Sequence, residues 1–193
     1  MNSLSFPAVQ WIIGLPSAGK STLATALRRR VTQAGLPSLL LDGDDLRGGL
    51  CRGLGFSDVD RTESLRRAAE VAALAARAGI GTVAAMITPL RSQREMIAEV
   101  LAGHRLLWVW ADCPMDECRR RDVKGLYRRQ WEGAVTNLTG ADGVFEAPGP
   151  EALRLDTAKS SVEQCVERIW TSMDEAKEAR RPDGLSEQVR EDC

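Results

Sequence analysis

A glycine-rich loop between an apolar strand and a helix constrains the fold of this chain most. Val9–Ile13 is a short apolar run that predicts a buried strand, and residues 14–21 follow it as Gly-Leu-Pro-Ser-Ala-Gly-Lys-Ser. These residues match GxxxxGK[ST], and the apolar spacing from Ser21 to Val31 predicts a helix directly after them. Such a loop turns backbone N–H groups toward an oxyanion at a helix N-terminus. The sequence therefore predicts a phosphate-binding loop (P-loop). The alternative interpretation is a glycine turn that matches the motif by chance.

The rest of the chain alternates short apolar runs with amphipathic segments. Further strands are expected at 39–41, 82–87, 106–111 and 153–155, and further helices at 62–78, 92–101, 115–121 and 161–173. The helix at 62–78 is expected to be capped by Asp60 or Thr62. Strands apolar on both faces that alternate with helices predict an α/β fold with a parallel sheet covered on both sides.

The 193 residues fit a single domain, expected to span residues 1–173 and to be followed by a polar tail at 174–193. Residues 122–150 contain five glycines and two prolines and show little apolar periodicity. We interpret this interval as a long functional loop and call it the lid segment. Trp131 is expected to pack within it as an anchor.

Charge and composition exclude several function classes. The 26 basic and 27 acidic residues give a net charge of -1, which does not favour nucleic-acid binding. The most apolar stretch, from Ala68 to Leu90, is interrupted by charges and glycines, so no membrane segment is expected. Five cysteines without CxxC spacing and one histidine do not predict zinc. We expect reduced cysteines and a cytoplasmic protein.

Polar residues follow the predicted strands at the edge where parallel sheets bind ligands. The second strand ends in Asp42-Gly43-Asp44-Asp45-Leu46-Arg47. A carboxylate at this place can orient a substrate hydroxyl, accept its proton or hold Mg²⁺. The alternative for the same residues is an Asx turn that caps a short helix.

Several further motifs occur in a recognisable order. They are Leu-Gly-Phe-Ser at 54–57, Asp-Arg-Thr-Glu-Ser-Leu-Arg-Arg at 60–67, Thr-Pro-Leu-Arg at 88–91, Lys-Gly-Leu-Tyr at 124–127, and Asn-Leu-Thr-Gly at 137–140 before Glu-Ala-Pro at 146–148. With these motifs the chain resembles the adenylyl-sulfate kinase (APS kinase) family from about Gln10 to Trp170. The resemblance implies a three-layer P-loop kinase fold with a five-stranded parallel sheet, helices on both faces and a lid loop. It also implies transfer of the γ-phosphate of ATP, with Mg²⁺, to the 3′-hydroxyl of adenylyl sulfate in sulfate assimilation, and a possible homodimer.

The resemblance assigns roles to residues at the matching positions. The catalytic residues are expected to be Asp42, Lys20 and Asp44, and Mg²⁺ is expected at Ser21 and Asp42. ATP is expected to contact Gly14, Leu15, Pro16, Ser17, Ala18, Gly19, Lys20, Ser21, Thr22 and Arg121. The small-molecule nucleotide acceptor is expected to contact Asp42, Arg47, Phe56, Arg61, Ser64, Lys124 and Leu138.

The chain departs from the family pattern only on the acceptor side. Ser64 stands where the family usually has asparagine, Leu138 where it has phenylalanine, Thr136 where it has lysine and Leu90 where it has tyrosine. The first hypothesis is an APS kinase with a looser acceptor pocket. The second is a related kinase that phosphorylates a hydroxyl of another nucleotide conjugate, for instance a cytidine diphosphate derivative, and a third is a non-catalytic nucleotide-binding module. The sequence alone does not decide the identity of the acceptor. It also does not decide whether Asp42 acts as a base or only orients the hydroxyl.

Overall fold

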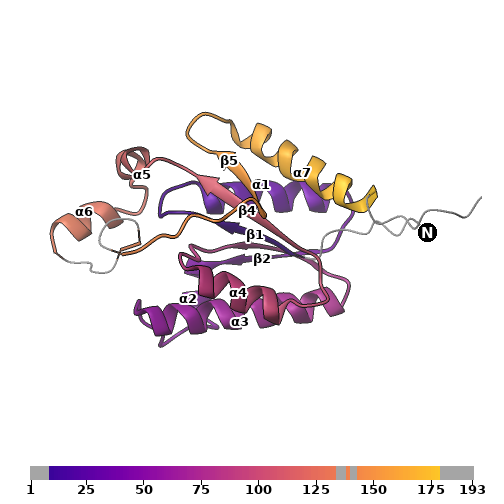
Figure 1. The fold of residues 1–193 in the computed structure, drawn as a ribbon, viewed down its shortest axis with the longest axis horizontal. Coiled ribbons are helices and arrows are strands. Elements are labelled where there is room, and N and C mark those ends of the chain that lie inside the picture. Colours follow the sequence, from indigo (N-terminus) through magenta and orange to yellow (C-terminus); the bar gives the residue numbers. More distant parts are fainter. Residues whose placement is uncertain (1–8, 134–137, 140–142, 179–193) are drawn as a thin grey trace, which may run out of the picture.

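A computed structural model describes residues 9–133, 138–139 and 143–178, with side chains described up to residue 173. Strands and helices alternate along the chain (Figure 1). The elements are β1 (Val9–Ile13), α1 (Lys20–Gln33), β2 (Ser38–Asp42), α2 (Gly43–Gly48), α3 (Asp58–Arg77), β3 (Gly81–Ala85), α4 (Arg91–Val100), β4 (Leu106–Asp112), α5 (Met115–Arg121), α6 (Leu126–Trp131), β5 (Ala152–Asp156) and α7 (Val162–Glu178).

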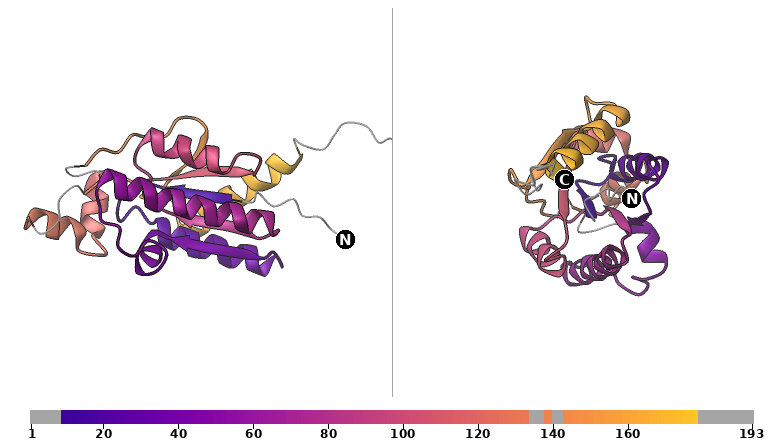
Figure 2. Two further views of the ribbon diagram at one scale, coloured as in Figure 1. Left: turned by 90° about the horizontal axis from the view of Figure 1, so that it is seen from below. Right: turned by 90° about the vertical axis from the view of Figure 1, so that its right-hand side faces the viewer.

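The five strands form one parallel sheet in the order β2-β3-β1-β4-β5. Helices α1 and α7 cover one face, and α3 and α4 cover the other, which the end-on view in Figure 2 separates into layers. The central position of β1 places the loop that follows it in the middle of one sheet edge. The predicted three-layer α/β fold with a five-stranded parallel sheet is confirmed.

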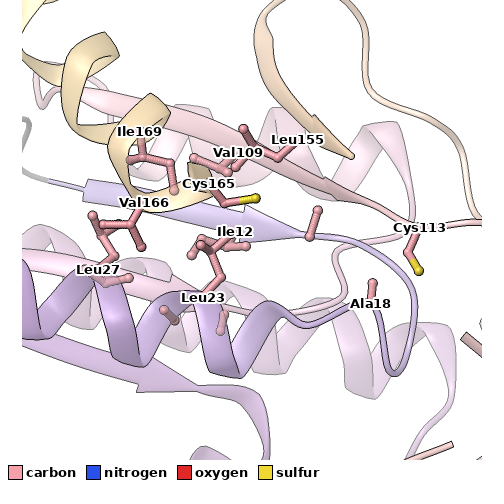
Figure 3. Packing of buried hydrophobic residues seen from close by; sticks show 14 of the residues in the cluster. Ile12, Ala18, Leu23, Leu27, Val109, Cys113, Leu155, Cys165, Val166 and Ile169 are labelled. Carbon is pink, nitrogen blue, oxygen red and sulfur yellow. The ribbon is translucent and has the colours of Figure 1, made fainter. Parts of the chain in front are cut away.

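The alternation of side chains along β1 divides the core into two clusters. Ile12 faces α1 and α7, where it packs with Leu23, Leu27 and Ile169 (Figure 3). On the other face, Trp11 and Ile13 pack against α3 and α4. Both faces of β1 are fully buried, so the start of α1 is fixed to the centre of the molecule.

The second cluster also holds the turn that follows β3. Trp11 is fully buried, and its indole Nε1 donates a 2.9 Å hydrogen bond to Oγ1 of Thr88. Thr88 adopts a φ of 47°, a left-handed conformation that is uncommon for a residue other than glycine. This buried hydrogen bond helps to keep the strained turn in place beside the end of β1.

Four helices differ clearly from the sequence predictions in their bounds or in having been expected at all. Helix α3 begins at Asp58, because the hydroxyl of Ser57 accepts from the N–H of Asp60, so a cap at Asp60 or Thr62 was wrong. The short helix α6 was not predicted, and α2 was predicted only in the alternative interpretation of residues 42–47 as an Asx turn that caps a short helix. Helix α7 continues to Glu178, beyond the expected end of the last helix at 173.

The lid segment contains α6, and Trp131 at the end of that helix is 90% exposed, so its expected role as a packed anchor is wrong. Residues 134–137 and 140–142 of the lid segment, including Thr136 and Asn137, lie outside the described residues, as do residues 179–193 of the tail. Within the described ranges, no helix combines the length and apolar character needed to cross a membrane.

Candidate active site

The carboxyl ends of the strands meet at one edge of the sheet, beside α5 and α6 (Figures 1 and 2). A cleft of about 660 Å³ opens there. It is lined by the P-loop, the end of β2 with α2, the first turns of α3, the turn after β3 and parts of the lid segment. The cleft therefore brings together the two groups of residues that the sequence assigned to ATP and to the acceptor.

The backbone of the P-loop requires glycine at its first position. Gly14 has a φ of 149°, and a Cβ atom there would lie 2.5 Å from the carbonyl oxygen of Ala111 on β4. Gly19, with a φ of 91°, forms the N-cap of α1. The first-turn N–H groups of α1 have no partner within the helix and carry its positive dipole end. This end of α1 suits a phosphate.

The carbonyl groups of the P-loop are bound by the protein. The oxygen of Leu15 accepts from Nζ of Lys20 at 2.7 Å. The oxygen of Pro16 accepts from the Tyr127 hydroxyl at 3.1 Å, and the oxygen of Ala18 accepts from Oγ1 of Thr157 at 2.9 Å. The loop is thus tied to its own lysine, to α6 and to the segment that follows β5.

Lys20 carries a pKa lowered to about 8, chiefly because burial disfavours its charged form. The positive charge of Lys124 lowers it further, whereas Asp42 and Cys118 act in the opposite direction. At pH 7 the ammonium group is still mostly protonated. A bound phosphate would stabilise that charge and raise the pKa.

Asp42 is both the last residue of β2 and the N-cap of α2. Its Oδ1 accepts from the backbone N–H of Asp44 at 2.9 Å, so the Asx-turn interpretation holds. Asp42 lines the cleft together with Ser21 of α1, so capping does not remove it from the site. Asp44 forms an ion pair with Lys124, which joins the lid segment to α2.

The donor set at Ser21 and Asp42 fits Mg²⁺. A hydroxyl and a carboxylate are the oxygen ligands that this ion uses, together with substrate phosphates and water. Among the described residues no group of three or more histidine, cysteine or acidic side chains could hold a metal ion. The side chains therefore suit an ion that the nucleotide helps to bind, and they do not form a complete protein cage.

Two arginines converge on the loop that carries Phe56. The Arg47 guanidinium lies 4.2 Å from the centre of the Phe56 ring and donates to the carbonyl of Gly55 at 2.8 Å. Arg61, which is buried, donates to the carbonyl of Phe56 at 3.4 Å. Burial lowers the pKa of both arginines, and the charge of Arg47 adds to the effect on Arg61. Two partly desolvated positive charges side by side favour an anion.

The remaining acceptor-side residues also line the cleft. Phe56 is 62% exposed, with Arg47 over its ring. Ser64 is buried and donates to Sγ of Cys51 at 3.3 Å, so its hydroxyl is turned to the protein. Leu138 is 7% exposed and contributes an apolar surface. These acceptor-side residues thus combine apolar surface with positive charge supplied by arginine.

Three predicted ATP contacts do not line the cleft: Gly14, Leu15 and Ala18. The side chain of Ala18 is fully buried in the core, and Leu15 packs against the same cluster. Gly14 lies against Ala111. The side of the loop formed by these residues faces the protein interior and supports the loop conformation. The other predicted ATP and acceptor residues line the cleft.

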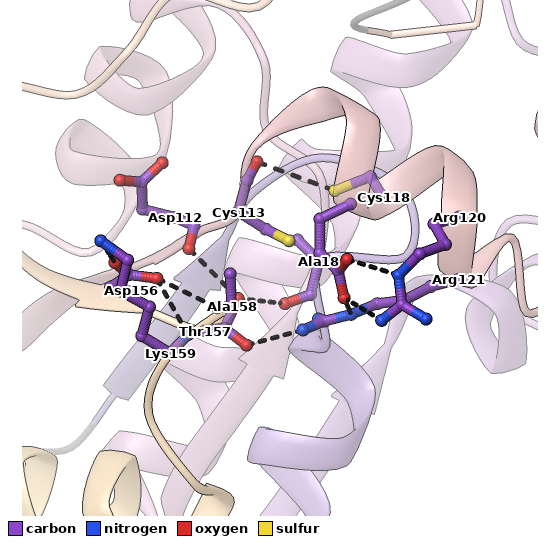
Figure 4. Close-up of polar contacts among 11 residues, drawn as sticks. Ala18, Asp112, Cys113, Cys118, Arg120, Arg121, Asp156, Thr157, Ala158 and Lys159 are labelled. Carbon is purple, nitrogen blue, oxygen red and sulfur yellow. Dashed lines mark hydrogen bonds and ion pairs between the residues drawn. The ribbon is translucent and has the colours of Figure 1, made fainter.

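Arg121, at the end of α5, lies beside the P-loop (Figure 4). Its Nε donates to Glu117 and its Nη2 donates to the carbonyl of Thr157, both at 2.8 Å. Hydrogen bonds from Arg120 and Arg121 lower the pKa of Glu117 to about 2. The guanidinium is therefore held in one orientation at the rim of the cleft.

Sequence reasoning assigned no role to two residues of this region. Tyr127 belongs to the Lys-Gly-Leu-Tyr motif, and its buried hydroxyl contacts the P-loop. Thr157 follows β5, whose carboxyl end belongs to the same ligand-binding edge as the other strand ends. Applying that rule to the fifth strand would have found it.

Comparison with known proteins decides the family. The sequence model of the family described as adenylylsulphate kinase matches residues 6–156. The chain belongs to the adenylyl-sulfate kinase family. A relative, the adenylyl-sulfate kinase of Pseudomonas aeruginosa, is 44% identical over 163 residues, which cover 84% of this chain and 83% of that protein. Membership makes the chain a phosphotransferase with an alcohol acceptor, as the motifs predicted.

Solved structures agree with this membership. The Mycobacterium tuberculosis APS kinase CysC in complex with AMPPNP and APS has a TM-score of 0.84 and 35% identity, and covers 88% of this chain and 98% of that one. A hexameric APS kinase from Thiobacillus denitrificans has a TM-score of 0.65 and 25% identity, and covers 87% of this chain and 29% of that one. The first of these structures was solved with AMPPNP and APS, and none of these relatives supports a different nucleotide conjugate as acceptor.

Proposed function

We propose that the chain transfers the γ-phosphate of ATP to the 3′-hydroxyl of adenylyl sulfate, which gives ADP and 3′-phosphoadenylyl sulfate. One observation carries the proposal. A single cleft holds a complete P-loop on one side and, on the other, Asp42 with the group formed by Arg47, Phe56 and Arg61. The hydroxyl oxygen forms a bond to the γ-phosphorus as the bond between that phosphorus and the β,γ-bridging oxygen breaks. ADP leaves with the bridging oxygen, and the hydroxyl proton is released.

The ATP side is assigned to the P-loop and to Arg121. First-turn N–H groups of α1 bind the phosphates, and Lys20 neutralises charge on the β- and γ-phosphates. This charge neutralisation matters because phosphoryl transfer depends on positioning and electrostatic stabilisation more than on covalent chemistry. Arg121 lines the cleft, and we assign its guanidinium to the base of the nucleotide.

Ser21 and Asp42 would hold Mg²⁺. When bound, Mg²⁺ would supply positive charge that offsets the negative charge of the phosphates. Asp42 also accepts a hydrogen bond from the acceptor hydroxyl and orients its oxygen toward the γ-phosphate. Asp44 supports this role through its backbone N–H, which fixes the Asp42 carboxylate.

The acceptor side is assigned to α2, the start of α3 with the loop before it, and the lid segment. Arg47 and Arg61 bind the phosphosulfate group, because two partly desolvated guanidinium groups match its negative charge. The adenine packs between Phe56 and the apolar surface of Leu138, with Ser64 behind it. Lys124 closes this side through its ion pair with Asp44.

A coupled ADP-release assay with ATP and Mg²⁺ tests the proposal. Adenylyl sulfate is compared with adenosine 5′-phosphate and with cytidine diphosphate derivatives. Of these acceptors, we expect only adenylyl sulfate to give rapid ADP release. Turnover with a cytidine conjugate and none with adenylyl sulfate would contradict the proposed acceptor, and ATP binding without any turnover would support a non-catalytic module.

Assembly and location complete the proposal. We place the enzyme in the cytoplasm, which fits the four buried free thiols of Cys51, Cys113, Cys118 and Cys165. We also propose a homodimer, for which light scattering would give twice the 21.1 kDa mass of the chain. A mass of one chain at micromolar concentration would contradict it.

A further inference from the structure

Thr157, the first residue after β5, contacts the end of β4, the P-loop and α5 (Figure 4). Its backbone N–H donates to the carbonyl of Asp112 at the end of β4, at 2.9 Å. Its hydroxyl lies 2.9 Å from the carbonyl oxygen of Ala18 in the P-loop and 3.2 Å from that of Asp112. Its own carbonyl accepts from Arg121 on α5 at 2.8 Å. All three polar groups of this residue are therefore engaged with neighbouring elements.

The partners of Thr157 are themselves held in place. Arg121 is ion-paired with Glu117 at 2.8 Å, and both side chains are about three-quarters buried, with 26% and 22% exposed. Nη1 of Arg121 would lie 3.9 Å from a Cβ placed on Gly19, so the guanidinium lies close to the start of α1. Ala18 is fully buried. Thr157 is thus the residue that contacts both the back of the P-loop and the arginine at its rim.

We propose that Thr157 is a positioning residue for ATP. Its hydroxyl holds the P-loop, and its carbonyl holds Arg121. The distance between the phosphate-binding loop and the arginine assigned to the base is thereby fixed. The nucleotide then binds to a P-loop and an Arg121 side chain that are already in place. Preorganisation of this kind improves binding because less conformational freedom is lost when the ligand arrives. The inference rests on the proposed use of ATP, but it does not depend on the identity of the acceptor.

Paired substitutions test this role. Thr157→Val removes the hydroxyl and keeps the shape, whereas Thr157→Ser keeps the hydroxyl. We expect Thr157→Val to weaken binding of AMPPNP by about fivefold in calorimetry, the size of one lost hydrogen bond, and Thr157→Ser to restore it to within about twofold. The KM for ATP should rise in parallel, while the KM for adenylyl sulfate stays within about twofold.

A matched control is Thr32→Val, which removes a threonine hydroxyl that donates to the carbonyl of Arg28 at the exposed end of α1. We expect wild-type AMPPNP affinity for it. Wild-type affinity in Thr157→Val, or equal losses toward ATP and acceptor that Thr157→Ser does not restore, would overturn the inference. Failure of the proposed function looks different: wild-type protein would bind AMPPNP and leave adenylyl sulfate unphosphorylated, and the binding series would still decide the role of Thr157.

Discussion

The two sides of the cleft are built in different ways. The ATP side consists of backbone: the P-loop lies between a fully buried strand and a helix, and its carbonyl groups are bound by Lys20, Tyr127 and Thr157. The acceptor side consists of side chains on α2, on α3 and on loops, with Phe56 mostly exposed and Lys124 reaching across to Asp44. Main-chain geometry tolerates many sequences, whereas a side-chain pocket changes with each substitution. This difference explains why the departures from the family pattern fall on the acceptor side.

The comparison predicts its largest effect for Lys20→Ala. Losing the only ammonium group that contacts the P-loop among the described residues should lower kcat by about 10²- to 10³-fold, the cost of removing a preorganised transition-state donor. Circular dichroism should show an intact fold, because the side chain contributes no core packing. Steady-state kinetics decide the point. Activity within about twofold of wild type would remove Lys20 from the catalytic assignment.

Arg47→Ala should weaken binding on the acceptor side only. The guanidinium is assigned to the phosphosulfate group, so we expect the KM for adenylyl sulfate to rise by about 10- to 100-fold, the range for a hydrogen bond to a charged group. The KM for ATP should not change. Arg28→Ala on the exposed face of α1 is the control. A rise in the KM for ATP instead would show that the two sides are not separate.

Lys124→Gln tests the link between the lid segment and the acceptor side. Both partners of its ion pair with Asp44 are more than half exposed, so the melting temperature should hardly change. If the lysine positions the acceptor loop, kcat should fall by about tenfold, equivalent to about 1.4 kcal/mol of activation free energy. An unchanged kcat would show that the contact between Lys124 and Asp44 is only a surface ion pair without a role in catalysis.

Tyr127→Phe should give a smaller change, on the ATP side. It removes the hydroxyl that donates to the carbonyl of Pro16 and keeps the buried ring. We expect ATP to bind about fivefold more weakly and adenylyl sulfate to bind as in wild type. An effect confined to adenylyl sulfate would instead assign α6 to the acceptor side.

The lowered pKa of Lys20 predicts a pH effect on ATP binding. Its protonated form binds phosphate, so affinity should fall as pH rises through about 8. Because bound phosphate raises this pKa, binding at pH 8 should take up about half a proton. Calorimetry in two buffers of different ionisation enthalpy measures this uptake. The same uptake in Lys20→Ala would assign it to another group.

The sequence was sufficient for the framework of the site. The eight-residue motif and the apolar runs around it predicted the P-loop between β1 and α1, and Asp42 followed from its place at the end of β2. Both predictions rest on rules about strand ends and helix starts that hold in any parallel sheet.

Short elements and long-range contacts were less predictable. Helices α2 and α6 have six residues each, too few to show a helical period, and α6 is held by contacts from Asp122 and Tyr127. The choice of Ser57 over Thr62 as the cap of α3 depends on where the preceding loop ends. Thr157 meets Ala18 across 139 positions, which no local pattern could reveal.

The identity of the phosphorylated product tests the account most directly. Purified protein is incubated with ATP, Mg²⁺ and adenylyl sulfate, and the product is followed by phosphorus NMR. The account predicts one new phosphomonoester on the 3′-oxygen for each ADP formed, with the phosphosulfate group unchanged. No such signal, together with phosphorylation of a different nucleotide conjugate under the same conditions, would contradict it.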